Sequence, residues 1–211
     1  MVNSSDIPRP ESVAFFEKAI RQHNKVIDFK KINEYYYSVE LNNGCHYKIY
    51  LTNIYTVSLA DVMEFSISYD IDAIVTISSW NGYTLEAKEY SQSIGKGLFL
   101  FSELMGALNF EKPEEYFSGY HDEKNITMEF DEISIYQFGS SLNIQTPNDI
   151  DLLIVYRNRS YKEILKLIKL RRTLRIQLQK ILGIPIDIVL LSNKEERQLL
   201  YLDQINYKKI L

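Results

Sequence analysis

Three aspartates in the last third of the chain stand where their carboxylates could share a metal ion. Asp149 and Asp151 lie two residues apart at the head of one apolar run, and Asp187 lies at the start of another. Side chains alternate along a β-strand, so Asp149 and Asp151 are expected on one face, about 7 Å apart along the backbone. Carboxylate oxygens are the ligands that Mg²⁺ prefers, with water and phosphate completing its coordination. The spacing therefore predicts a magnesium site at the heads of two strands.

A turn of small residues stands just before these aspartates, where Gly139, Ser140 and Ser141 follow the hydrophobic run ISIYQF. Glycine lets a backbone approach a phosphate closely, and serine hydroxyls and free N–H groups can donate to it. We therefore expect these three residues to bind the phosphates of a nucleotide. A lone Asp-x-Asp also occurs at solvated strand ends. The order of Gly-Ser, Asp-x-Asp and a later Asp favours the functional interpretation, because carboxylates at the start of buried strands are costly unless something neutralises them.

The elements that must position these residues follow from hydrophobic periodicity in residues 126–211. Gly183 stands where a C-cap glycine belongs, and Asn193 is placed to cap the final helix. The pattern predicts strands at 133–138, 150–156 and 186–192, a long helix at 161–182 and a last helix at 193–205.

The front part of the chain, residues 1–112, shows a second alternation of strands and helices. Asn42, Asn43 and Gly44 between two alternating segments are typical of a hairpin turn. Pro113, Gly119 and clustered acids favour a linker at 113–125. The sequence thus predicts an α/β (α+β) protein with two small mixed-sheet domains, 1–112 and 126–211. The expected front elements are helices at 12–23 (after Ser12), 58–69, 84–94 (after Thr84) and 102–110, and strands at 34–41, 46–57, 72–79 and 97–102.

Residues 133–205 resemble the minimal core of the nucleotidyltransferase superfamily, the group related to DNA polymerase beta. Its signature is a hydrophobic strand, Gly-Ser, a short loop, Asp-x-Asp and a later Asp. Here these positions are Gly139, Ser140, Asp149, Asp151 and Asp187. The resemblance implies a minimal nucleotidyltransferase domain at 126–211. Such a domain transfers a nucleoside monophosphate from an NTP to a hydroxyl, with two Mg²⁺ ions and release of pyrophosphate.

In this reading Asp149, Asp151 and Asp187 are catalytic metal ligands, with Asp187 also helping to activate the acceptor. The NTP, with ATP expected first, transfers to a protein or small-molecule acceptor, because a minimal core leaves little room for a primer and template. By analogy with small antitoxin enzymes, a toxin-like protein partner is an expected acceptor, and a nucleic-acid end is the less favoured one. The alternative is a non-catalytic nucleotide- or partner-binding protein, antitoxin-like or DNA-associated, that retains the motif.

Members of this superfamily often carry a basic residue shortly after Gly-Ser, whereas the loop SLNIQTPN has none. Triphosphate charge must therefore be met elsewhere. Arg157, Arg159 and the basic residues of the 161–182 helix are candidates, with a solvated helix face as the alternative for most of them. On the other side of that helix we expect a core-facing row, made of Ile164, Leu167, Ile168, Leu174, Leu178 and Ile181.

The order of elements in 34–102 resembles the restriction-endonuclease core. Its nuclease needs an acid on one strand and Glu/Gln-x-Lys on the next. The corresponding strand reads His46, Tyr47, Lys48, and Glu86-Ala87-Lys88 falls in an expected helix. The resemblance therefore implies an accessory domain at 1–112 without a nuclease active site.

Composition sets the remaining bounds. Residues 1–125 carry 11 Lys/Arg against 18 Asp/Glu, and residues 126–211 carry 13 against 10, so a polyanion would be met by the back half. The single Cys45 excludes an internal disulfide, and the three histidines have no metal-ligand spacing. There is no apolar leader and no run of about 18 uncharged apolar residues, so a cytoplasmic protein without a membrane span is expected.

Overall fold

The computed structural model describes residues 7–117, 133–144, 146–157 and 160–211. The chain divides into two compact units, and each is described by itself. Among the described residues, the first unit holds 7–57 and 61–117, and the second holds 58–60 and the segments from 133 onward. Of the predicted linker 113–125, only residues up to 117 are described. Both units combine helices with a mixed sheet, which confirms the α+β class.

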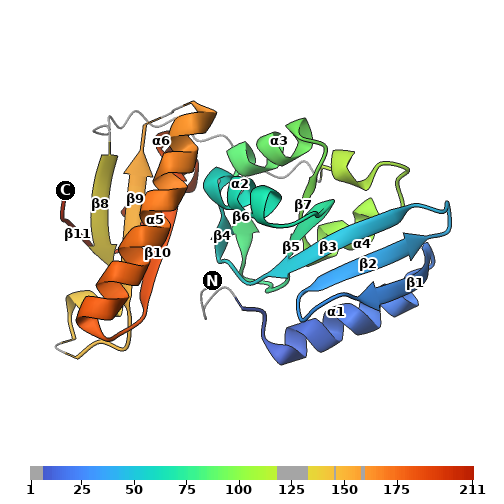
Figure 1. Cartoon of the computed structure of the whole chain (residues 1–211), viewed down its shortest axis with the longest axis horizontal. Helices are drawn as coiled ribbons and strands as arrows, with labels where there is room; N and C mark the ends of the chain where they lie inside the picture. Colours follow the sequence, from blue (N-terminus) through green and yellow to red (C-terminus); the bar gives the residue numbers. More distant parts are fainter. Residues whose placement is uncertain (1–6, 118–132, 145, 158–159) are drawn as a thin grey trace. The chain divides into compact units, whose positions relative to one another are not determined.

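The first unit is built on a five-stranded sheet in the order β1-β2-β3-β5-β7 (Figure 1). The strands β1, β2 and β3 pair antiparallel, while β3, β5 and β7 pair parallel. A small parallel pair is formed by β4 and β6. The elements of this part are α1 (Pro10–Gln22), β1 (Val26–Lys31), β2 (Tyr36–Leu41), β3 (His46–Thr52), β4 (Thr56–Val57), α2 (Leu59–Ser68), β5 (Ala73–Thr76), β6 (Gly82–Tyr83), α3 (Leu85–Ser93), β7 (Gly97–Leu100), α4 (Phe101–Ala107) and the 3-10 turn η1 (Pro113–Glu115).

The predicted hairpin of the first unit is confirmed as β2 and β3. Gly44 in its turn has φ +82°, a left-handed conformation that glycine adopts without steric cost. The cap at Thr84 is also confirmed, since its hydroxyl accepts a hydrogen bond from the N–H of Ala87 at 3.1 Å. The cap at Ser12 is wrong. The first helix begins at Pro10 with Arg9 as its N-cap, because proline lacks the N–H that the first turn leaves unused.

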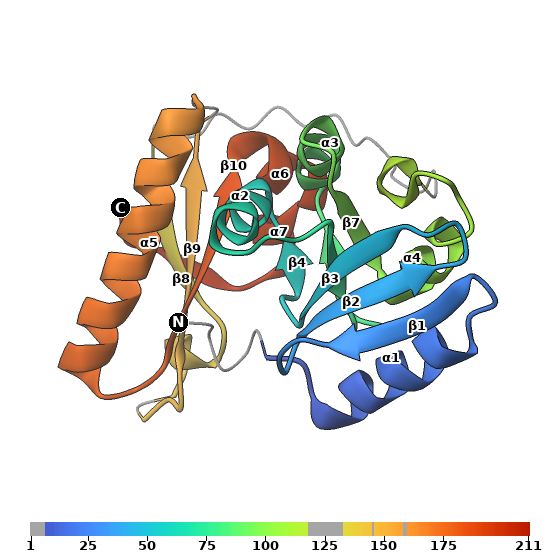
Figure 2. The ribbon, with the colours of Figure 1, turned by 45° about the vertical axis from the view of Figure 1, so that its right-hand side comes forward.

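The second unit is a four-stranded sheet in the order β10-β9-β8-β11. Strands β9 and β10 are parallel, and β8 pairs antiparallel with both β9 and β11. The helix α5 covers one face of this sheet and α6 lies on the other (Figures 1 and 2). The elements are β8 (Ile133–Phe138), the 3-10 turn η2 (Ser140–Leu142), β9 (Ile150–Tyr156), α5 (Tyr161–Leu182), β10 (Ile186–Ser192), α6 (Asn193–Leu199), α7 (Tyr201–Gln204) and β11 (Tyr207–Lys209).

The end of the chain differs from the sequence prediction. The expected helix at 193–205 is broken at Leu200, which has φ +50°, so that it forms α6 and α7. The cap of α6 is Ser192 rather than Asn193. The Ser192 hydroxyl accepts from the N–H of Glu195 at 3.1 Å, and the Glu195 carboxylate accepts from the N–H of Ser192 at 2.7 Å. Such a reciprocal capping box satisfies two N–H groups of the first turn at once.

The long helix α5 has the predicted bounds, and Gly183 with φ +73° is its confirmed C-cap. Its buried residues all lie in its first half, however, and Ile181 is 76% exposed. The prediction that Ile181 faces the core is wrong. A helix of 22 residues spans about 33 Å, whereas the seven-residue β10 spans about 23 Å, so the helix overruns the sheet. Among the described residues, no helix is both long and apolar enough to cross a membrane.

Candidate metal centre

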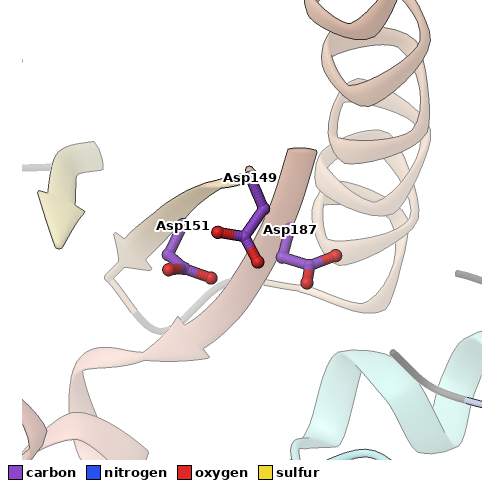
Figure 3. Close-up of side chains that lie close together, drawn as sticks. All are labelled: Asp149, Asp151 and Asp187. Carbon is purple, nitrogen blue, oxygen red and sulfur yellow. The ribbon is translucent and has the colours of Figure 1, made fainter. Parts of the chain in front are cut away.

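The three predicted aspartates converge at one end of the second sheet. Asp149 directly precedes β9, Asp151 is the second residue of β9, and Asp187 is the second residue of β10. Because β9 and β10 run parallel and in register, Asp151 and Asp187 are directly paired. One carboxylate oxygen from each aspartate lies within 4.8 Å of those from the other two (Figure 3). The described part of the chain holds no second group of three acidic, histidine or cysteine side chains so placed.

Strand alternation fixes the face of the sheet on which the acids lie. Asp151 belongs to the same row of β9 as the buried Leu153 and Val155, which pack with Leu202 of α7. The acids therefore lie on the face opposite α5, where that apolar row reaches the end of the sheet. Leu152 and Ile154 fill the other face of β9, and a shift by one residue would bring Asp151 onto that buried apolar face, so the cost of burying its charge opposes the shift.

The electrostatics of this end of the sheet favour a cation. Burial, followed by the charges of Asp149 and Asp187, raises the pKa of Asp151 to about 6. All three carboxylates are half-buried, so like charges face one another where solvent still reaches. A divalent ion would relieve this repulsion, and hard carboxylate oxygens are the donors that Mg²⁺ selects. The side chains of Asp149, Asp151 and Asp187 thus fit the metal that the sequence predicted.

Gly139 lies against the Asp151 carboxylate. The preceding residue, Phe138, is directly opposite Asp151 in the β8–β9 pairing. Gly139 has φ +77°, and a Cβ on it would lie 2.2 Å from Oδ2 of Asp151. Only glycine fits, both for its left-handed backbone and for the space that the carboxylate fills. The glycine predicted to approach phosphate thus also makes room for a carboxylate of the candidate metal centre.

The two serines after Gly139 have different surroundings. The Ser141 hydroxyl donates to the carbonyl oxygen of Phe138 at 3.2 Å and accepts from Nε2 of Gln137 at 3.1 Å. These bonds hold the turn η2 against the end of β8. Ser140 is exposed at the start of the turn. Of the two hydroxyls, that of Ser140 is therefore the better placed to reach a ligand.

One predicted compensating cation, Arg157, lies away from the acids. Arg157 follows the last residue of β9, roughly 20 Å along the strand from Asp151. Arg159 lies outside the described residues, and Arg171 is buried on α5 rather than solvated. The unforeseen strand β11 brings Lys208 and Lys209, both exposed, beside β8. The sequence did not indicate this strand, because three exposed residues leave no hydrophobic pattern. The only signal was the alternation of apolar and polar residues around Tyr207.

In the first unit the structure places the residues compared with the nuclease motif. His46, Tyr47 and Lys48 lie on β3, and no carboxylate stands among them. Glu86 and Lys88 lie on α3, as predicted, and Lys88 is buried.

Comparison of the chain with protein-family models, with curated proteins and with solved structures found no match. A function must therefore be inferred from the metal centre itself.

Proposed function

We propose that the second unit is a magnesium-dependent nucleotidyltransferase, which moves a nucleoside monophosphate from an NTP to a hydroxyl of a protein or small-molecule acceptor. The observation that carries this proposal is the convergence of Asp149, Asp151 and Asp187 within 4.8 Å, beside the Gly139 turn. An isolated Asp-x-Asp has many structural roles. A third aspartate paired in register from the neighbouring strand is what a site for divalent ions and phosphates requires.

The proposed reaction uses the three acids in separate roles. The acceptor hydroxyl oxygen attacks the α-phosphorus of the NTP and forms a new P–O bond, while the bond between the α-phosphorus and the bridging oxygen breaks. Pyrophosphate leaves with that oxygen. Asp149 and Asp151 would hold the magnesium ions, and Asp187 would take the acceptor proton. Bound magnesium would supply neutralisation of the triphosphate charge and polarisation of the α-phosphate.

The Gly139 turn would bind the phosphates. The exposed Ser140 hydroxyl can donate to a phosphate oxygen, and the first N–H groups of a helical turn have no acceptor within that turn. Lys209 of β11, on the same face as Tyr207, supplies positive charge two strands across and two residues along from Asp151, roughly 12 Å away. A flexible lysine side chain can cover much of that gap, so β11 replaces the basic residue that the loop lacks.

The first unit would act as an accessory domain that selects the acceptor. Its likeness in element order to the restriction-endonuclease core, without an acid on β3, supports binding rather than cleavage. A polypeptide such as a toxin-like partner suits a domain of this size as the acceptor.

Incubation of the full chain with each of the four α-labelled NTPs, Mg²⁺ and extract of the source cell tests the proposal. We expect a labelled acceptor and an equal amount of pyrophosphate, both lost when EDTA is added. The Asp151→Asn variant should lower both products on the order of 1,000-fold. Absence of label and of pyrophosphate with every NTP would contradict the enzyme.

The second candidate function is a nucleotide- or partner-binding protein without catalysis. It is favoured by one observation, namely that Arg157 lies at the far end of β9 from the acids. Such a protein would bind an NTP with Mg²⁺ and release no pyrophosphate in the same extract. The pyrophosphate measurement therefore separates the two functions.

A further inference from the structure

A row of paired residues runs across all four strands of the second sheet, starting from the metal centre. Asp187 pairs with Asp151, Asp151 with Phe138, and Phe138 with Tyr207. Directly paired residues of neighbouring strands point to the same face of a sheet. The row therefore has two acids at one side and two aromatic rings at the other, and all four side chains lie on the same face of the sheet.

The aromatic side of this row is reinforced from α7 and β8. The rings of Phe138 and Tyr201 lie edge to face, with centroids 5.5 Å apart and an interplanar angle of 87°. Tyr136 and Tyr207 make a similar contact at 5.2 Å and 85°. These contacts fix the rings in place, because edge-to-face packing is a favoured arrangement of aromatic side chains.

The aromatic side chains of this row are not all buried in the core. Tyr136 is buried, but Phe138 and Tyr201 are half-buried and Tyr207 is 45% exposed. Neighbouring strands lie about 4.8 Å apart, so Tyr207 stands roughly 10 Å from Asp151 across the sheet. This is the length scale of a nucleotide, with the phosphates over the acids and the base over the rings.

We propose that Phe138, Tyr201 and Tyr207 form a nucleobase-binding surface, here called the aromatic platform. The inference rests on the proposed function, since it assumes that phosphates bind at the acids. Stacking on a ring is sequence-tolerant because every base has a π-face. The aromatic platform therefore accepts all four bases and holds purines, with their larger ring area, more tightly than pyrimidines.

Tyr207 is the residue to test, because it is the most exposed member of the aromatic platform. The test measures binding to the full chain, with Mn²⁺ present, of two ligands: a non-hydrolysable ATP analogue and inorganic tripolyphosphate, which has no base. We expect Tyr207→Ala to weaken binding of the analogue about tenfold and to leave the affinity for tripolyphosphate unchanged. Tyr207→Phe should bind the analogue within about twofold of the unaltered chain, because it keeps the ring.

Two further variants guard against trivial explanations. Tyr207→Leu keeps an apolar side chain on β11 but lacks a π-face, so it should behave as Tyr207→Ala while the thermal midpoint stays unchanged. Tyr161→Ala removes a comparably exposed tyrosine (51%) from α5, which covers the opposite face, and should change neither affinity.

The outcomes separate the two proposals. Equal affinities for the analogue in the unaltered chain and in Tyr207→Ala would overturn the aromatic platform, as would a loss in Tyr207→Phe as large as that in Tyr207→Ala. Equal affinities of the unaltered chain for the analogue and for tripolyphosphate would overturn it too, and in these cases the proposed function stands. A chain that binds neither ligand would overturn the proposed function itself.

Discussion

Lys88 in the first unit and Asp151 in the second both have shifted pKa values, but their surroundings differ. In the first unit, Lys88 is fully buried, donates from Nζ to the carbonyl oxygen of Leu98 at 2.6 Å and lies 4.3 Å from the Phe99 ring centroid. Nearby, buried Glu103 accepts from the Tyr83 hydroxyl at 2.8 Å. In the second unit, three half-buried aspartates face one another at the end of a sheet.

The shifts have different meanings because their causes differ. Burial lowers the pKa of Lys88 to about 8, and the charge of Glu103 partly offsets this effect. Burial also raises the pKa of Asp151 to about 6, but there the neighbouring like charges add to it. Lys88 is buried away from solvent and already donates a hydrogen bond to Leu98. The three aspartates, in contrast, repel one another and remain partly accessible to solvent. A shifted pKa thus indicates a binding site only where a ligand can reach the group and relieve it.

The largest expected difference between the two groups is in catalysis. Asp151→Asn should lower nucleotide transfer on the order of 1,000-fold, because it removes a metal ligand from the site of charge development. Lys88→Met should leave transfer within about twofold, since a buried structural lysine touches no reactant. The labelled-NTP assay measures both. Retained transfer in Asp151→Asn, with the fold intact by circular dichroism, would place the chemistry elsewhere.

The next largest effect is on stability at alkaline pH. The folded-state pKa of Lys88, about 8, lies below the ordinary value of about 10.4, so the unfolded chain binds the extra proton between these values. Stability contributed by Lys88 therefore rises as pH increases through this window, by about 2–3 kcal/mol. Urea unfolding of the unaltered chain and of Lys88→Met at pH 7.5 and 10 gives the difference. Identical pH dependence in both proteins would show that Lys88 is not desolvated.

Gly139 and Gly183 provide a comparison that tests the geometry of the candidate metal centre. Both have a positive φ, with ψ −162° at Gly139 and 8° at Gly183, but a Cβ would meet Asp151 only at Gly139, and at Gly183 nothing lies within 4 Å. Alanine should cost about 1 kcal/mol at Gly183 and about 1–2 kcal/mol more at Gly139. Only Gly139→Ala should also weaken Mn²⁺ binding. Equal costs at the two positions would mean that Asp151 can move away freely.

The smallest expected effect is the acid dependence of Asp151. Its folded-state pKa of about 6 lies above the ordinary value of about 3.9, so the folded chain holds the proton more tightly. The resulting stability is present below about pH 4 and is lost as pH rises through 6, by about 1 kcal/mol after allowance for solvent screening. Thermal unfolding without metal should show this loss in the unaltered chain and not in Asp151→Asn. Saturating Mg²⁺ should restore the lost stability above pH 6.

The sequence predicted the bounds of those strands and helices that have long apolar patterns. The bounds of β8, α5 and β10 were read correctly because their buried rows are continuous, and parallel strand heads bring Asp151 and Asp187 together. It could not predict β1 or β11, whose side chains are largely exposed, nor the left-handed Leu200 that divides the last helix.

Register is the other quantity that the sequence lacked. The pairing of Phe138 with both Asp151 and Tyr207 depends on hydrogen bonds between strands that are distant in the chain. A one-residue shift in either pairing would turn these side chains to opposite faces. The aromatic platform could therefore be recognised only from the folded sheet, although all its residues were visible in the sequence.

Metal binding at the three aspartates can be measured without any acceptor. Mn²⁺ titrated into the full chain loses its free electron paramagnetic resonance signal as it binds. We predict two bound ions per chain, displaced by Mg²⁺, and none in a variant with Asp149, Asp151 and Asp187 all changed to asparagine. Equal Mn²⁺ binding by the unaltered chain and this variant would contradict the metal centre and the nucleotidyltransferase built on it.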